Sequence, residues 1–315
     1  MVEVMPELPD VEAFRGVLAS CAQGAVIRRV DVYDSGVLHG VSARRLRTEL
    51  TGRAFAAPER HGKWLLAPTV RGSEAALETA LESASEGARE GPELLVHFGM
   101  TGELVCEDAG AGLHRHDRVV FTVEGGGAEG DGDGDGGSDR GRDRGRDRGG
   151  GGGGSGGARE LRYRDQRKLK GLWLVDAGGA DRMLAEQGPD AAEVGRTGFD
   201  ELLAGRRGGL KSALTDQSVI AGLGNLLADE ILWRARLHPS EAVSGLSQEE
   251  RGRLYAQVRG TVRASVRAGR VPGRDSWLTG HRDARDAHCP RCGTALRRTR
   301  VAGRTTVWCP HCQRR

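Results

Sequence analysis

The chain has 315 residues, of which 37% are hydrophobic and 50 are glycine, and its formal net charge at pH 7 is +3. This length allows two domains and a small module, and the glycine content indicates that part of the chain is not packed. No apolar run approaches the roughly 18 residues of a membrane span, and no signal-peptide pattern is present, so we expect a cytoplasmic protein.

Charge is distributed unevenly along the chain. Residues 1–124 contain 13 Lys and Arg against 19 Asp and Glu, whereas residues 208–315 contain 19 against 9. A basic C-terminal third is typical of a protein that binds a polyanion, although such surfaces also serve solubility alone.

The N-terminal part of the chain predicts one helix followed by many short strands. Pro9 suits the first turn of a helix whose apolar face contains Val11, Phe14, Val17 and Leu18. Apart from a short helix over 42–50, the following elements are short apolar or alternating runs, several of them closed by Gly or Pro, which favours a β-sandwich or barrel. These runs are Ala25–Tyr33, Arg53–Pro58, Lys63–Pro68, Leu94–Phe98, Glu103–Cys106, Arg118–Val123, Glu160–Tyr163 and Leu172–Val175.

Two segments interrupt these strands. Gly72–Glu93 is rich in Ala, Glu and Ser and predicts a solvated helical insertion. Gly125–Ala158 consists of Asp-Gly repeats, Asp-Arg-Gly repeats and a glycine run, so it cannot bury apolar surface and is predicted to be a disordered loop, with weak nucleic-acid contact as the alternative. It interrupts a hairpin formed by Val119–Val123 and Glu160–Tyr163.

The chain becomes helical after a linker over 188–198. The predicted helices are Phe199–Ala204, Gly209–Thr215, Asn225–Ala235 and Ser247–Ala268. We therefore predict an α+β protein with a helix and β-sandwich in 1–190, a helical domain in 191–275 and a small module in 276–315.

The C-terminal module carries the strongest local motif. Cys289, Cys292, Cys309 and Cys312 form two Cys-x-x-Cys pairs, which together supply four thiolates for one tetrahedral, structural Zn²⁺. The alternative is two redox-active pairs, which a reducing cytoplasm disfavours. The remaining Cys21 and Cys106 are expected to be small buried hydrophobic residues.

The N-terminus offers a possible nucleophile. If translation begins at Met5 and that residue is removed, Pro6 becomes a secondary amine that can attack a carbonyl-like carbon, with Glu7 as its acid–base partner. We expect Met5, and not Met1, to be the true start. The alternative interpretation of the same residues is an ordinary helix N-terminus.

Further motifs each have two interpretations. Gly222–Asn225 precedes a predicted helix, where backbone N–H groups suit a phosphate, but it also fits an ordinary corner between helices. Met100 lies in a Gly-bounded turn and could enter a base stack, although such residues are more often core. Lys63 and Arg304, like other single cations, fit either phosphate contacts or a solvated surface.

These motifs together resemble the formamidopyrimidine-DNA glycosylase/endonuclease VIII family. The motifs that carry the resemblance, in chain order, are Pro6–Pro9, Lys63, His97–Gly102, Gly222–Asn225 and the four-cysteine ribbon with Arg304. The resemblance covers nearly the whole chain outside 72–93 and 125–158. It implies an N-terminal helix plus β-sandwich, a helix–two-turn–helix domain and a zinc ribbon, with damaged double-stranded DNA bound between them. It also implies that the protein is a monomer.

The resemblance also implies a role for each matching residue. Pro6 matches the Schiff-base nucleophile, Glu7 the proton donor in base release, and Lys63 and Arg304 positions that assist strand cleavage. The residues that match DNA-contacting positions are Met100, His116, Arg167, Arg206 and Asn225, of which Met100 matches the residue that fills the vacated stack.

The expected activity is thus that of a base-excision repair DNA glycosylase with abasic-site lyase activity. Leu169 stands where family members commonly have an aromatic residue, and Gly269–His288 is too short for the lesion-covering loop of the 8-oxoguanine-specific branch. Formamidopyrimidines, oxidised pyrimidines and 8-oxoguanine therefore all remain candidate lesions. The rival interpretations are an inactive DNA-structure-binding paralogue and a zinc-ribbon nucleic-acid-binding factor.

Overall fold

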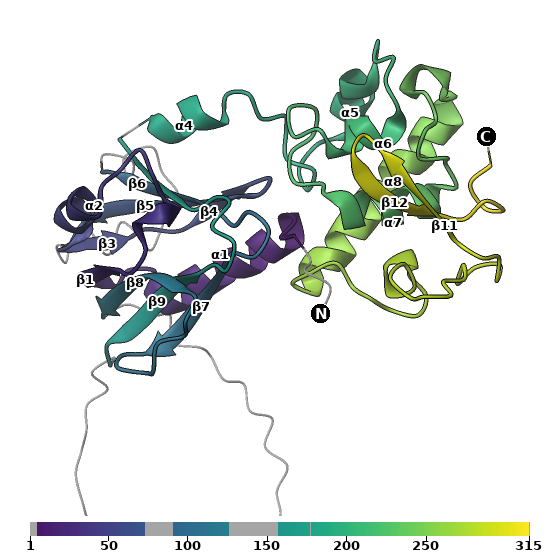
Figure 1. The fold of residues 1–315 in the computed structure, drawn as a ribbon. Helices are drawn as coiled ribbons and strands as arrows, with labels where there is room; N and C mark the ends of the chain where they lie inside the picture. The colour runs from purple at the N-terminus through teal and green to yellow at the C-terminus, as the bar shows by residue number, and fades with distance from the viewer. Residues whose placement is uncertain (1–4, 73–90, 126–156, 177, 315) are drawn as a thin grey trace, which may run out of the picture.

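The computed structural model describes residues 5–72, 91–125, 157–176 and 178–314, and Figure 1 shows a β-rich lobe beside a helix-rich lobe. The helix predicted over Gly72–Glu93 and the loop predicted over Gly125–Ala158 lie mostly outside these residues. Across the described ranges, no helix has the length and apolarity that a membrane span requires.

Helix α1 (Leu8–Ala22) connects the cores of the two lobes. Its first turn contains Pro9, and the Glu7 backbone N–H donates to Asp10 Oδ2 at 2.9 Å. Leu8 is buried in the core of the helical lobe, whereas Val11 and Leu18 are buried in the core of the β-rich lobe. The start of α1 therefore lies at the junction between the lobes, and Glu7 lies there with it.

The β-rich lobe contains a ten-stranded sheet within the described residues, and the sheet folds over on itself. Its strand order is β2-β10-β6-β5-β3-β1-β8-β9-β7, with β4 beside β5. The strands are β1 (Val26–Val32), β2 (Leu38–His39), β3 (Arg53–Phe55), β4 (Glu59–His61), β5 (Trp64–Arg71), β6 (Glu93–His97), β7 (Glu103–Asp108), β8 (Asp117–Glu124), β9 (Arg159–Arg164) and β10 (Leu172–Val175).

Strand β5 belongs to both layers of this sandwich. Its first part, through Pro68, pairs with β6, and its last part, from Thr69, pairs with β3. Proline has no N–H for the ladder, which suits a position where pairing changes from one neighbour to another. The predicted sandwich is confirmed, and so is the hairpin, because Val119 pairs with Tyr163 in the β8–β9 ladder.

The expectation for Cys21 and Cys106 was wrong. The two residues form a disulfide that connects the last turn of α1 to β7, with Cα atoms 5.8 Å apart. They are separated by 85 residues in sequence, so no local pattern indicates the pairing. It arises because α1 packs along β7 in the folded lobe.

We expect loss of this disulfide to destabilise the β-rich lobe. Closing a loop of this length reduces the entropy of the unfolded chain, and the corresponding stabilisation is roughly 4 kcal/mol. The Cys21→Ala/Cys106→Ala variant should therefore melt several degrees below the unsubstituted protein in the absence of reductant. Equal melting temperatures by scanning calorimetry would show that the bridge does not form in solution.

The helical lobe contains α5 (Arg196–Leu203), α6 (Leu210–Thr215), α7 (Asn225–Ala235) and α8 (Gln248–Arg267), and α4 (Gly179–Leu184) lies in the connection before it. These helices coincide with the predicted ones to within a few residues. The N-terminus of α8 has a capping box formed by Ser247 and Glu250, whose reciprocal bonds satisfy backbone donors that would otherwise be unpaired. The apolar faces of the four helices form one core.

The C-terminal ribbon consists of β11 (Arg297–Val301) and β12 (Arg304–Trp308). Ala302 and Gly303 form the two-residue turn, and both have positive φ, at 50° and 73°. That combination is the type I′ geometry, which matches the twist of a hairpin. The ribbon packs against α7 through Trp233 and Val307, so its tip faces the start of α7 and the junction between the lobes.

Candidate active site

Glu7 is the central buried group at the junction. Its side chain is 1% exposed, and its carboxylate accepts the backbone N–H groups of Gly224 at 3.0 Å, Leu226 at 2.8 Å and Leu227 at 3.1 Å. These donors belong to the first turn of α7, so a residue before α1 caps a helix more than 200 positions later. A Cβ at Gly224 would lie 2.3 Å from Glu7 Cδ, which explains why glycine is needed there.

Lys63 lies near Glu7, in the two-residue turn between β4 and β5, and is 9% exposed. Burial raises the pKa of Glu7 above its usual value, against the opposing effects of Lys63 and the backbone N–H donors. Burial also lowers the pKa of Lys63, which the negative charge of Glu7 partly offsets. An acid whose pKa is raised beside an ammonium whose pKa is lowered is the arrangement that proton transfer near neutral pH requires.

A pocket of about 400 Å³ opens beside these groups. Pro6 is buried next to Glu7, and Met5 lines the pocket, so removal of Met5 would place the Pro6 nitrogen at its wall. The residues that line the pocket are Met5, Glu7, Met100, Asn225, Leu226, Arg282, Asp283, Arg298, Arg304 and Thr305. Five separate segments of the chain thus meet around one cavity.

Buried polar contacts fix the ribbon tip that carries Arg304. Asn225 Nδ2 donates to the Thr305 carbonyl at 3.0 Å. Lys211 is fully buried and its Nζ donates to Asp229 Oδ1 at 2.6 Å and to Thr306 Oγ1 at 2.7 Å. These bonds hold the hairpin on α7, so the exposed Arg304 guanidinium is carried at the pocket rim on a rigid support.

Met100 and the segment after β9 lie on the β-rich side of the site. Met100 is half-buried in the turn after β6 and lines the pocket. The Arg167 backbone N–H donates to Thr101 Oγ1 at 3.0 Å, so the two loops are bonded together. Leu169 is 51% exposed beside Gly99. An exposed apolar side chain next to Met100 gives this edge two residues that could enter a base stack.

Three predicted DNA-contacting residues, His116, Arg167 and Arg206, lie outside the pocket lining. His116 is half-buried, with Nδ1 3.1 Å from Arg118 Nη2 and Nε2 accepting from Arg115 at 3.1 Å. Arg206 follows α5, and its Nε donates to the Leu202 carbonyl at 2.9 Å. All three remain predicted DNA contacts.

The four cysteines of the ribbon converge as a metal site requires. Their sulfur atoms all lie within 4.8 Å of one another, with Cys292 and Cys309 at 3.5 Å and Cys289 and Cys312 at 3.9 Å. Zn–S bonds of about 2.3 Å place sulfurs at the corners of a tetrahedron about 3.8 Å apart. The donor set and its spacing fit one structural Zn²⁺, as predicted.

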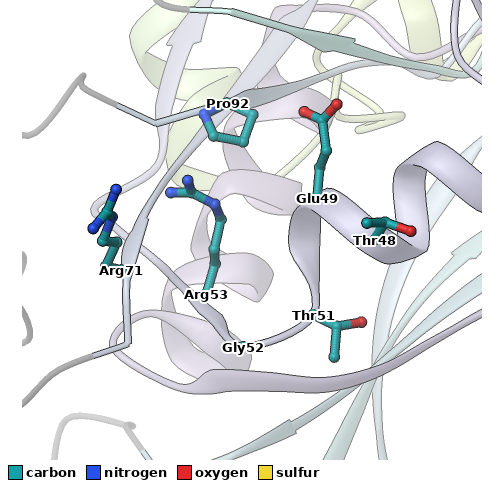
Figure 2. Close-up of a pocket in the computed structure, with 7 residues that line it drawn as sticks. All are labelled: Thr48, Glu49, Thr51, Gly52, Arg53, Arg71 and Pro92. Atoms are coloured by element: carbon teal, nitrogen blue, oxygen red, sulfur yellow. The ribbon is translucent and has the colours of Figure 1, made fainter.

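A second hollow lies at the far end of the β-rich lobe. Figure 2 shows it between α2 (Ala43–Leu50), β3 and β5, with the side chains of Arg53 and Arg71 on one side and Glu49 on the other. Glu49 is already paired with Arg45 at 2.6 Å. This hollow shares no lining residue with the pocket at Glu7, so it lies outside the candidate active site.

Comparison with known proteins agrees with this geometry. The formamidopyrimidine-DNA glycosylase N-terminal domain matches residues 5–133, the helix–two-turn–helix domain of the same enzyme matches 187–274, and the zinc finger found in that enzyme and in an isoleucyl-tRNA synthetase matches 289–315. A formamidopyrimidine-DNA glycosylase of Symbiobacterium thermophilum is 32% identical, over 98% of this chain and 89% of its own. One of a Nocardioides species is 32% identical, over 98% and 94%.

The chain belongs to the formamidopyrimidine-DNA glycosylase family.

Solved structures support the same fold. The formamidopyrimidine-DNA glycosylase of Lactococcus lactis, non-covalently bound to DNA that contains an abasic site, superposes with a TM-score of 0.73 at 22% identity, over 98% of this chain and all of that one. A complex of the wild-type Lactococcus lactis protein with DNA that contains an oxidised pyrimidine gives 0.75 at 21% identity. The predicted three-part architecture is therefore confirmed as the fold of this family.

Sequence reasoning assigned no role to several polar residues of this family member. Arg282 is 4% exposed, lines the pocket, and has Nη2 3.3 Å from Asp229 Oδ2. Asp283 lines the same pocket, and Lys211 and Asp229 form the buried pair behind the ribbon. A single charged residue forms no local motif. However, Asn225 and Asp229 are four residues apart and share one face of a helix, a pattern from which a common polar contact surface could have been predicted.

We expect zinc removal to release the ribbon tip selectively. Without the ion, four thiols and the small core around Trp233 and Val307 are too few to hold the hairpin. Chelation should weaken binding to abasic-site duplexes at least about 10-fold in fluorescence anisotropy, and added Zn²⁺ should restore it. The helical circular dichroism signal should change little, because α5–α8 have their own core. Unchanged affinity after complete metal loss would contradict this expectation.

Proposed function

We propose that this protein is a base-excision repair enzyme that removes oxidised bases from duplex DNA and then cleaves the abasic site through a Schiff base on Pro6. The observation that carries the proposal is the pocket lined by Glu7 and Met5, with Pro6 between these two residues in the chain and the buried Lys63 close enough to Glu7 to interact electrostatically. The relatives that this chain matches over almost their full length are named formamidopyrimidine-DNA glycosylases. Their names support the same activity here.

The chemistry follows from the groups at the pocket. A damaged base must leave the helix stack before its glycosidic bond can be reached. Glu7 supplies the proton that the departing base takes as the C1′–N bond breaks. The Pro6 nitrogen forms a bond to C1′ as the base leaves, and the C1′–O4′ bond then breaks while the amine proton is transferred to O4′, which gives an open-chain iminium. The iminium acidifies the C2′ hydrogen, and loss of that proton expels the 3′ phosphate with the C3′–O bond electrons.

The cations and apolar residues have matching roles in the proposal. Lys63 and Arg304 contact the phosphates next to the lesion and stabilise their charge. Met100 fills the space that the everted base leaves, and Leu169 adds apolar surface beside it. Asn225, His116, Arg167 and Arg206 contact the DNA backbone. Because these contacts release counterions, affinity should fall steeply with salt concentration.

This mechanism requires a free amine on Pro6. With Met5 attached, the Pro6 nitrogen is an amide and cannot act as a nucleophile. The family match begins at Met5, which supports translation from that residue followed by its removal. We therefore propose that the active enzyme begins at Pro6.

The test is a panel of duplexes that contain a formamidopyrimidine, an oxidised pyrimidine, 8-oxoguanine or an abasic site. Protein that begins at Pro6 should nick at least one lesion duplex and the abasic duplex, and borohydride should convert the intermediate into a stable protein–DNA adduct. Tight binding to every duplex without nicking or adduct would favour a non-catalytic DNA-structure-binding protein instead.

A further inference from the structure

The turn that carries Lys63 is fastened to the helical lobe by one buried carboxylate. Asp190, in the segment before α5, is 2% exposed. Its Oδ2 accepts the Gly62 backbone N–H at 2.6 Å and also Arg60 Nη1, and its Oδ1 accepts Arg60 Nη2 at 3.3 Å. Oδ1 also accepts the Ala192 N–H at 2.8 Å. Most of its bonds therefore go to the residues that immediately precede Lys63.

The same turn packs directly on the loop that supports Glu7. Gly62 has φ +57°, and a Cβ there would lie 2.7 Å from Ala221 Cβ and 3.0 Å from the Gly222 nitrogen. The Gly222 carbonyl in turn accepts the N–H of Leu8, the neighbour of Glu7, at 3.1 Å. A movement of this turn would therefore change the distance between Lys63 and Glu7.

Arg60 connects the turn to a third element. Its side chain is 7% exposed, and its Nε donates to Glu12 Oε2 on α1 at 2.9 Å. His61 adds a contact of 3.0 Å between Nε2 and the Gly188 carbonyl. The buried guanidinium therefore has two carboxylate partners, from α1 and from the connection between the lobes, and loss of Asp190 leaves it half paired.

We propose that Asp190 is a positioning residue, which holds the β4–β5 turn against the helical lobe and thereby keeps the Lys63 ammonium in position to contact the phosphate next to the lesion. Asp190 itself contacts no substrate. The inference rests on the proposed function for the role of Lys63, but the geometry of the turn can be tested without any catalytic activity.

The first measurement is the reactivity of Lys63 in DNA-free protein. Asp190→Asn keeps the shape of the side chain but removes its charge, and Glu193→Gln removes an exposed carboxylate three residues away as a matched control. Acetylation of Lys63 by an N-hydroxysuccinimide ester, followed by peptide mass spectrometry, should be at least about 5-fold faster in Asp190→Asn. It should be unchanged in Glu193→Gln. Equal Lys63 labelling in all three proteins, with melting temperatures unchanged, would overturn the proposal.

The second measurement is a double-mutant cycle on single-turnover nicking of abasic duplexes. Asp190→Asn should lower the rate at saturating DNA about 10-fold in the unsubstituted background and by less than 2-fold when Lys63 is already Met, because both changes remove the same interaction. An equal loss in both backgrounds would assign Asp190 a merely structural role. If the unsubstituted protein does not nick, the proposed function fails, and the labelling result still decides whether Asp190 holds the turn.

Discussion

Replacement of Glu7 by Gln is expected to lower the rate of base release by about 10²- to 10⁴-fold, the usual contribution of a general acid. The amide cannot donate the proton that the departing base needs. Its NH₂ group would also replace one acceptor oxygen, either Oε1, which accepts the Leu226 N–H, or Oε2, which accepts those of Gly224 and Leu227. The measurement is single-turnover release of an oxidised base from a duplex.

The same variant provides its own control. An abasic site has no base to protonate, so Glu7→Gln should retain nicking of abasic duplexes within about 10-fold of the unsubstituted protein. A parallel collapse of both activities would indicate that the substitution disrupts the first turn of α7 and not only the chemistry. A melting curve of each protein separates these two causes.

Glu7 should also produce a distinct pH dependence. Because burial raises its pKa, the acid stays protonated to higher pH than free glutamic acid, and base release should fall as pH rises through that pKa. This falling limb should be absent from the residual activity of Glu7→Gln. Its persistence in the variant would assign the limb to another group.

The second large effect concerns the N-terminus. Two proteins should be compared: one without Met1–Val4, so that Met5 is the initiator and is removed, and one with Met5→Leu, so that translation begins only at Met1. The first should form a borohydride-stable adduct with abasic DNA and the second none, because its Pro6 nitrogen is an amide. Both should bind the DNA. Equal adduct formation would exclude Pro6 as the nucleophile.

Structural features that depend on residues close together in the chain could be predicted from the sequence. The cysteine spacing indicates a metal site because two Cys-x-x-Cys turns suffice to define it. The helices at Asn225–Ala235 and in 247–268 follow from their apolar periodicity, and the second also from its local capping box. The glycines of the Gly222–Asn225 loop are explained by the contact of Gly224 with Glu7, although the sequence alone suggested only an anion site.

Interactions between distant residues could not be predicted. Nothing near Cys21 indicates its bond to Cys106, and nothing near Asp190 indicates its contact with the β4–β5 turn 128 residues earlier. The burial of Lys211 by the ribbon likewise depends on how three elements pack. Such contacts depend on tertiary packing. A single sequence contains no local pattern that shows which distant residues meet.

The most direct test of the proposed chemistry is to locate the adduct. Protein that begins at Pro6 is reduced with borohydride on abasic DNA, digested with protease and nuclease, and sequenced by mass spectrometry. We predict that the sugar remnant is attached to the nitrogen of Pro6. Attachment to Lys63 or to another lysine would contradict the account.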